Sequence, residues 1–224
     1  MSAPLRLVVF DVDGTLVDSR AHILAAMREA FARAGLTPPE DARALEVVGL
    51  SLPVAITRLC PDAPEPLARA LAEHYRDAFA ELRATTPSPL FPGARAALAH
   101  LAARDEVLLG VATGKSRRGL DHLLATHALE WAFHTTQVAD GHPSKPHPSM
   151  LHAALRETGA EARHAVMIGD TSFDMEMAGN AGMAALGVSW GHHSADRLRA
   201  AGAAAVLPDF DALAATLDRL WEVA

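Results

Sequence analysis

The stretch LRLVVFDVDGTLVDS, residues 5–19, decides the fold, because an apolar run within it ends abruptly in two acids and a glycine. The run Leu5–Phe10 is too short for a buried helix and indicates a buried strand, with Asp11, Asp13 and Gly14 in the turn that follows. Alternate residues of a strand point to the same face, so both acids could address one ligand. Aspartate and glycine are also ordinary turn residues, and the other segments must decide between a structural and a functional interpretation.

Three further short apolar runs have the same character: Glu106–Val111, Ala165–Ile168 and Ala184–Val188. Helical patterns fall between or beside them, at Gly93–Ala103, Ser116–Thr126, Pro148–Thr158 and Ser172–Asn180. Strands that alternate with helices predict an α/β fold, a doubly wound parallel sheet covered on both faces. Ligands of such sheets bind at the carboxyl ends of the strands, which is where the polar clusters of this chain fall.

The long interval between the first two strand patterns has helical periodicity and no convincing strand. Arg20–Ala34 and Leu67–Leu82 are its clearest helical patterns, and the proline-rich segment Thr85–Gly93 has the composition of a hinge. The interval therefore predicts an inserted all-helical cap. The predicted domains are an α/β core, residues 1–17 and 89–224, and the helical cap, residues 18–88.

Composition narrows the class of partner. The chain has 224 residues, half of them apolar, a formal net charge of -7 and a pI near 5.9. This balance predicts a soluble protein with no field that would attract nucleic acid or an anionic membrane, so an anionic ligand would need a local site. A single cysteine, no signal-like start and no apolar run of membrane-spanning length predict a cytoplasmic location. The sequence leaves the oligomeric state open.

A second polar cluster, VATGKS, residues 111–116, lies at a predicted strand end that opens a helix. Thr113 offers a hydroxyl, Gly114 permits close approach of a backbone, and Ser116 could cap the helix. Lys115 is informative because the chain has only two lysines, Lys115 and Lys145, among 20 basic residues. Both occupy polar loops at predicted strand ends, which favours a functional role over a scattered surface role.

Two more clusters complete the set. In SKPHP, residues 144–148, a proline stiffens the loop that carries Lys145, whose ammonium could neutralise a phosphoryl oxygen or a carboxylate. In IGDTSFD, residues 168–174, Asp170 follows a strand pattern and Asp174 lies one helical turn further on, although a helix cap would look similar. Carboxylates gathered at strand ends suit a hard divalent cation, and Mg²⁺ commonly takes one or two of them with waters and a phosphate oxygen.

In order and spacing these four segments resemble the motifs of the haloacid dehalogenase-like (HAD) hydrolase superfamily. The position of the cap after the first motif resembles the helical-cap subfamily IA, and Ala181–Phe210 is similar to phosphoglycolate phosphatase-like members. The resemblance implies that Asp11 is a nucleophile which forms an aspartyl phosphate, and that Asp13 is the general acid and base. The dehalogenases lack an acid at the position of Asp13, so the resemblance is to phosphatases.

The same resemblance implies a substrate site and a metal site. The transferring phosphoryl group would meet Thr113, Gly114, Lys115 and Lys145, and the cap loop Val47–Pro53, which reads the leaving group in this subfamily, would contribute Gly49 and Ser51. Mg²⁺ would be held by Asp11, the Asp13 carbonyl and Asp170. Asp174 would steady Lys145 or a water on the metal.

The favoured function is hydrolysis of a small phosphorylated metabolite, a phosphoglycolate-like monoester. A β-phosphoglucomutase-like phosphomutase, an inorganic pyrophosphatase and a catalytically silent phosphate- or partner-binding module remain alternatives. Against the mutase, Ile23 stands where family phosphomutases have a histidine, and no lysine or arginine lies in Val47–Pro53 to hold a second phosphate. Many phosphoglycolate phosphatases carry an acid where this chain has His22. We expect His192 and His193 to be polar residues at the rim of the site.

Overall fold

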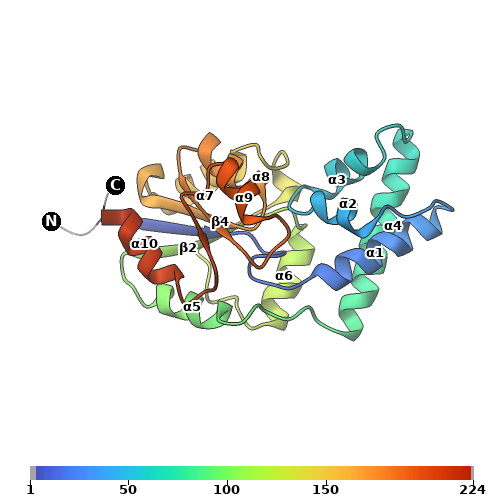
Figure 1. Ribbon diagram of the computed structural model, residues 1–224. Coiled ribbons are helices and arrows are strands. Elements are labelled where there is room, and N and C mark those ends of the chain that lie inside the picture. Colours follow the sequence, from blue (N-terminus) through green and yellow to red (C-terminus); the bar gives the residue numbers. More distant parts are fainter. Residues whose placement is uncertain (1–3, 223–224) are drawn as a thin grey trace.

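Six parallel strands form one sheet in the computed structural model, which describes residues 4–222 (Figure 1). The strands are β1 (Arg6–Phe10), β2 (Val107–Thr113), β3 (Thr135–Val138), β4 (Ala165–Gly169), β5 (Ala184–Val188) and β6 (Ala205–Leu207). Their order in the sheet is β3-β2-β1-β4-β5-β6, so the chain changes direction across the sheet between β1 and β4. Open parallel sheets bind their ligands at such a switch point.

Helices cover both faces of the sheet. They are α5 (Ala94–Ala102), α6 (Arg117–Thr126), α7 (Ser149–Thr158), α8 (Ser172–Asn180), α9 (Ala195–Ala200) and α10 (Leu213–Glu222), with short 3-10 turns at Ala139–Gly141 and Ala162–His164. Alternate residues of β1 enter two separate apolar clusters: Val8 packs with α5, α6 and α10, whereas Val9 packs with α7, α8 and α9. Burial on both faces explains why β1 is almost uniformly apolar. The predicted doubly wound α/β fold is confirmed.

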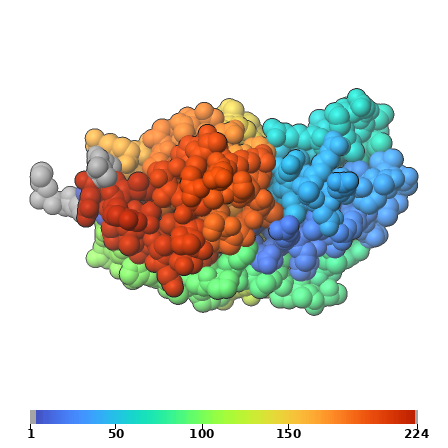
Figure 2. Space-filling model, viewed as in Figure 1, coloured from blue at the N-terminus to red at the C-terminus, as the bar shows by residue number. Residues whose placement is uncertain are grey.

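Four helices lie between β1 and α5 in the chain and form the lobe on the right of Figure 1. These cap helices are α1 (Arg20–Arg33), α2 (Asp41–Glu46), α3 (Leu52–Leu59) and α4 (Glu65–Thr85). They bury a cluster of their own, which Phe173 of α8 joins from the core. Figure 2 shows this blue and cyan lobe packed directly against the orange part of the core. Within residues 4–222, not even α4 has the length and apolarity to cross a membrane.

The sequence missed two strands, both at sheet edges. β3 has the sequence TTQV, and its Thr135 and Gln137 side chains both donate hydrogen bonds to Glu157 of α7. Those polar side chains are satisfied by a tertiary partner, so the strand lacks an apolar pattern. β6 has three residues, too few to give a periodic signal. The cap is helical throughout, as predicted, but its limits at residues 18 and 88 stay a prediction.

Candidate active site

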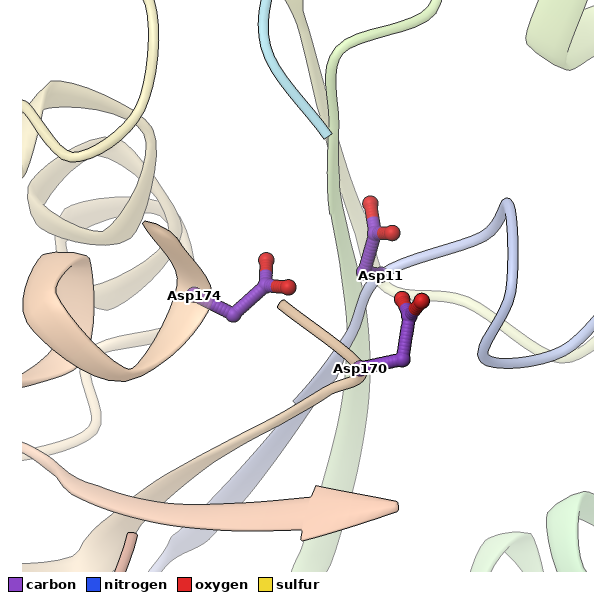
Figure 3. Close-up of side chains that lie close together, drawn as sticks. All are labelled: Asp11, Asp170 and Asp174. Atoms are coloured by element: carbon purple, nitrogen blue, oxygen red, sulfur yellow. The ribbon is translucent and has the colours of Figure 1, made fainter. Parts of the chain in front are cut away.

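Three buried carboxylates meet at the switch point of the sheet (Figure 3). Asp11 follows β1, Asp170 follows β4, and Asp174 lies in the first turn of α8. One oxygen from each lies within 4.8 Å of the others, and the three residues are at most 1% exposed. Like charges so close together and away from water repel, so the arrangement requires positive charge.

The protein supplies part of that charge through Lys145, which is completely buried. Its Nζ lies 2.7 Å from Oδ1 of Asp11 and 2.6 Å from Oδ1 of Asp174. Burial alone would lower the pKa of Lys145, but its two carboxylate partners outweigh burial and raise that pKa. For Asp11, burial dominates over the opposing effect of Lys145 and raises the pKa of the carboxyl to about 8, with Asp174 and Asp170 adding to the rise.

An atom of Asp11 shows where further positive charge would fit. Oδ2 of Asp11 is buried and has no hydrogen-bond partner among the described residues, although a buried carboxylate oxygen normally has one. A divalent cation bound by Asp11 and Asp170 would satisfy this oxygen and offset the excess of carboxylates over ammonium groups. The residues present therefore fit a hard divalent cation.

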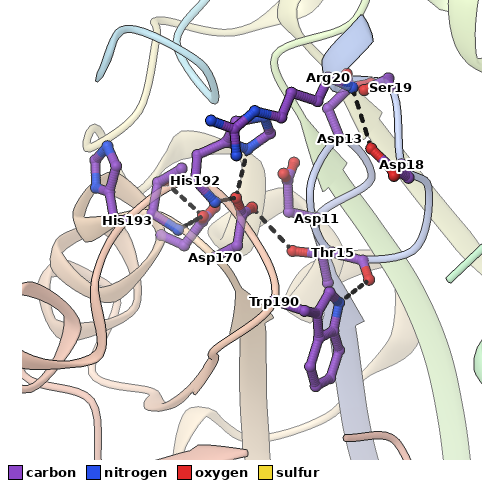
Figure 4. A network of polar contacts seen from close by, with 12 residues as sticks. Asp11, Asp13, Thr15, Asp18, Ser19, Arg20, Asp170, Trp190, His192 and His193 are labelled. Atoms are coloured by element: carbon purple, nitrogen blue, oxygen red, sulfur yellow. Dashed lines mark hydrogen bonds and ion pairs between the residues drawn. The ribbon is translucent and has the colours of Figure 1, made fainter. Parts of the chain in front are cut away.

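Asp170 is held in place by groups that the sequence did not reveal (Figure 4). Thr15 Oγ1 donates to its Oδ1 at 3.1 Å, while the backbone N–H and Nδ1–H of His192 both donate to its Oδ2, at 2.8 and 2.7 Å. The same packing requires a glycine at position 14. Its φ is +87°, and a Cβ there would lie 2.2 Å from Asp170 Oδ2. Thr15 follows that glycine directly, which is the one sequence signal that could have identified it.

The expectation that His192 and His193 lie at the rim is wrong. The His192 side chain is 3% exposed against Asp170, and His193 is buried with its Nδ1 accepting the Ser172 N–H at 2.9 Å. Burial alone would lower the pKa of His192, but Asp170 outweighs burial and raises it. The spacing of these two adjacent histidines in the sequence indicates no site. They reach Asp170 only because the chain returns to it after β5.

Asp13 and Lys115 meet across the ends of β1 and β2. Lys115 Nζ lies 2.9 Å from Oδ2 of Asp13, and Ser19 Oγ donates to the other oxygen. The same ammonium lies over the Phe79 ring of α4, 4.8 Å from its centroid. The second predicted acid is therefore held apart from the three-carboxylate cluster, by a lysine that also touches the cap.

Thr113 ends β2 and is buried. Its Oγ1 accepts the N–H of Lys115 at 3.2 Å, which leaves the hydroxyl proton free to donate to a ligand. Ser116 caps α6 as predicted, accepting the N–H of Gly119 at 3.2 Å. Asp174 has a second task besides its pair with Lys145, because it completes a capping box with Thr171 at the start of α8.

Glycines allow the cap loop to lie on the core. A Cβ on Gly114 would lie 2.5 Å from the carbonyl oxygen of Leu50, and one on Gly49 would lie 3.0 Å from Thr171 Oγ1. Next to them, the Ser51 N–H donates to Ser144 Oγ at 2.9 Å. These contacts border a cavity of about 920 Å³ between cap and core, which reaches Asp11 and Asp13 and which Gly49, Ser51, Thr113, Gly114 and Lys115 help to line.

Known proteins resemble this chain over nearly all of its length. A family model described as haloacid dehalogenase-like hydrolase matches residues 8–188. A protein of Dickeya dadantii named "Probable phosphatase IndB" is 37% identical over 209 residues, which are 91% of this chain and 90% of that protein. A phosphoglycolate phosphatase of Rhodospirillum rubrum is 33% identical and covers 93% of this chain and 89% of that protein. A solved hydrolase from Pseudomonas syringae has a TM-score of 0.85 and 26% identity, covering 98% of this chain and 99% of that chain.

These matches extend over both the three-carboxylate cluster and the cap. They confirm the resemblance seen in the four motifs, the similarity to phosphoglycolate phosphatases and the prediction of a hydrolytic enzyme. The chain belongs to the haloacid dehalogenase-like hydrolase family.

Proposed function

We propose that the protein is a Mg²⁺-dependent phosphatase that hydrolyses a small phosphate monoester through an aspartyl phosphate on Asp11. The observation that carries the proposal is the buried Asp11, which Lys145 orients through one oxygen while the other has no partner among the described residues. A carboxylate nucleophile of this kind splits hydrolysis into two easier displacements. Mg²⁺, held by Asp11, the Asp13 carbonyl and Asp170, would supply positive charge that screens the repulsion between nucleophile and phosphate.

In the first displacement, Asp11 attacks phosphorus, the bond to the ester oxygen breaks, and the leaving alkoxide takes a proton from Asp13. In the second, Asp13 accepts a proton from water as that water attacks the aspartyl phosphate and regenerates Asp11. Lys145 and the free hydroxyl of Thr113 bind the oxygens of the transferring group, with Gly114 and Lys115 beside them. Asp174 keeps Lys145 in position through their 2.6 Å contact.

Relatives and cap chemistry support a phosphatase acting on a phosphoglycolate-like substrate. Several relatives of similar length are named phosphoglycolate phosphatases. The mutase alternative is less well supported by the two residues at this position of the cap. Ile23 is a buried apolar residue on the cavity wall. His22 points to Ser88, with its Nδ1 3.0 Å from Ser88 Oγ. A mutase must exclude water until a second hydroxyl arrives, and neither side chain offers a group for that step.

A substrate panel tests the proposal. Phosphoglycolate, other small phosphate monoesters, a hexose 1-phosphate and pyrophosphate would each be incubated with the protein and Mg²⁺, and both free phosphate and remaining substrate measured. We expect free phosphate to appear at the rate at which a monoester disappears, and EDTA to stop the reaction. Conversion of the hexose 1-phosphate to its 6-phosphate with little free phosphate, or preference for pyrophosphate, would replace the phosphatase by one of its alternatives.

A further inference from the structure

The cavity between cap and core has an apolar wall and a charged rim. On the cap side it is lined by Ile23, Met27, Val48, Leu50, Tyr75 and Phe79. Pockets that bind small molecules combine such a wall with a few polar groups that fix the orientation of the ligand. The floor holds Asp11 and Asp13, where the phosphoryl group would react, so polar groups elsewhere on the lining face the remainder of the substrate.

Most charged groups of the cavity already have partners. Lys115 pairs with Asp13 at 2.9 Å, Glu81 pairs with Arg33 at 2.9 Å, and Asp140 accepts the backbone N–H of Arg117. Three arginines on the lining differ from them: Arg76, Arg83 and Arg118. None of the three makes an ion pair or a side-chain hydrogen bond among the described residues, and Asp77, the remaining acid of the lining, pairs with none of them.

Arg83, which is half-buried, and Arg118, which is exposed, come from opposite sides of the cavity and lie near each other. Arg83 is close to the end of cap helix α4, and Arg118 is in the first turn of α6, beyond β2. A Cβ on Gly119 would lie 3.9 Å from Arg83 Nη1, which places the Arg83 guanidinium on that first turn. Burial and the nearby charge of Arg118 lower the pKa of Arg83, as expected for like charges that share no acid.

Two neighbouring guanidinium groups that share no carboxylate repel each other, and an anion bound between them would offset that repulsion. We propose that Arg83 and Arg118 bind a second anionic group of the substrate, a carboxylate or a phosphate on the leaving-group side. This inference rests on the proposed function, which puts the reacting phosphoryl group at Asp11. Arginine suits the role because its planar guanidinium binds either anion through paired hydrogen bonds, and the amino end of α6 favours the same charge.

The proposal changes how the cap selects its substrate. The loop Val47–Pro53 has no basic residue, so it can shape the leaving group but not pair with its charge. The negative charge of the leaving group would instead be bound by one arginine from the cap and one from the core. An anionic substrate would therefore draw the two sides of the cavity together. An ester with a neutral leaving group would lack this contact.

Binding to an inactive variant tests the site without relying on turnover. In the Asp11→Asn protein with Mg²⁺, calorimetry would compare phosphoglycolate, ethylene glycol bisphosphate and 2-hydroxyethyl phosphate, which carry a carboxylate, a second phosphate and a neutral hydroxyl. We expect at least one of the two ligands with an anionic second group to bind about 10-fold or more tightly than the ligand with a neutral hydroxyl, which is the usual weight of a charge-assisted hydrogen bond. Which of them binds more tightly identifies the anion.

Variants assign that preference to the arginines. Arg83→Gln and Arg118→Gln should each reduce the preference about 10-fold, whereas Arg69→Gln, on the same helix α4 but outside the cavity lining, should leave it intact. Melting curves would verify that each variant is folded. Equal affinity for all three ligands, or a preference that survives both substitutions, would overturn the proposal. A preference that persists while the wild-type protein hydrolyses no ester would refute the phosphatase and leave the anion site standing.

Discussion

At the scale of single residues, the buried charges around Asp11 do not cancel. Lys145 pairs with Asp11 and Asp174, no lysine or arginine pairs with Asp170 within the described part of the chain, and Oδ2 of Asp11 lacks a partner there. Such an imbalance costs stability in the free protein and makes the site favourable for a cation. His192 takes part in that balance, since it fixes the orientation of one carboxylate with two hydrogen bonds.

Substitutions of His192 should therefore change metal affinity. His192→Ala removes the Nδ1–H that donates to Asp170. Loss of a hydrogen bond to a metal-binding side chain typically weakens metal binding about 10–100-fold. His192→Asn can place an amide N–H where Nδ1–H lies and should retain most of the affinity. Calorimetric titration with Mg²⁺ would measure both. Equal losses in the two variants, or none in either, would contradict the positioning role.

The sequence showed some of these residues and not others for a physical reason. Asp11, Thr113 and Asp170 were predictable because each lies at the carboxyl end of an apolar strand, and parallel strands bring those ends to one edge of the sheet. The contact of Lys145 with Asp174 was implied only by the family resemblance, and that of His192 with Asp170 was not foreseen, because both depend on how distant loops return to that edge. No local pattern encodes such returns.

At the scale of secondary-structure elements, the cap loop Val47–Pro53 packs against the loop after β2 so closely that a side chain on Gly114 would not fit. Gly114→Ala would put a Cβ 2.5 Å from the Leu50 carbonyl oxygen, and such overpacking should destabilise the fold by about 1–3 kcal/mol. The displaced cap loop should also lower kcat/KM. Thermal or urea unfolding and steady-state kinetics would measure the two effects.

Gly179 provides the matched control, since it lies in α8 with no atom within 4 Å of an added Cβ. Gly179→Ala should stabilise the protein by about 0.5–1 kcal/mol, because alanine loses less backbone entropy in a helix. If Gly114→Ala were as stable and as active as wild type, the cap loop would not rest on the core in solution.

A helix or strand was predictable from the sequence to the degree that its own residues show the periodic alternation of apolar and polar side chains. β5 and α8 have the predicted bounds, whereas β3 was missed because Glu157 of α7 satisfies its polar side chains. The helical periodicity of the cap was visible in α1 and α4, but its short helices α2 and α3 gave too few residues for a periodic signal.

At the scale of the whole molecule, metal binding should be linked to pH and to stability. Folding raises the pKa of Asp11, so the metal-free folded protein binds more protons than the unfolded chain between about pH 4 and about pH 8. The contribution of Asp11 to stability is thus present at low pH and is lost as the pH rises through this window. Mg²⁺ must displace the same proton, so its stabilising effect should increase with pH.

Melting temperatures with Mg²⁺ and with EDTA, at about pH 5 and above about pH 8, test this linkage. We expect a larger rise in Tm on adding Mg²⁺ at the higher pH. In Asp11→Asn, which has no titrating carboxyl at this position, the pH dependence of that rise should be much smaller. A rise in Tm that is the same at both pH values in the wild-type protein would contradict the linkage.

The central claim is that the phosphoryl group passes through Asp11, and direct capture of the intermediate tests it. Enzyme mixed with a monoester and Mg²⁺ would be quenched in acid during the first turnover, reduced with borohydride, and digested for peptide mass spectrometry. Borohydride reduces an acyl phosphate to an alcohol, so we predict that Asp11 becomes homoserine, with no such change in the Asp11→Asn protein. An unmodified Asp11 in an enzyme that is turning over, or reduction at another acid such as Asp13 or Asp170, would contradict the account.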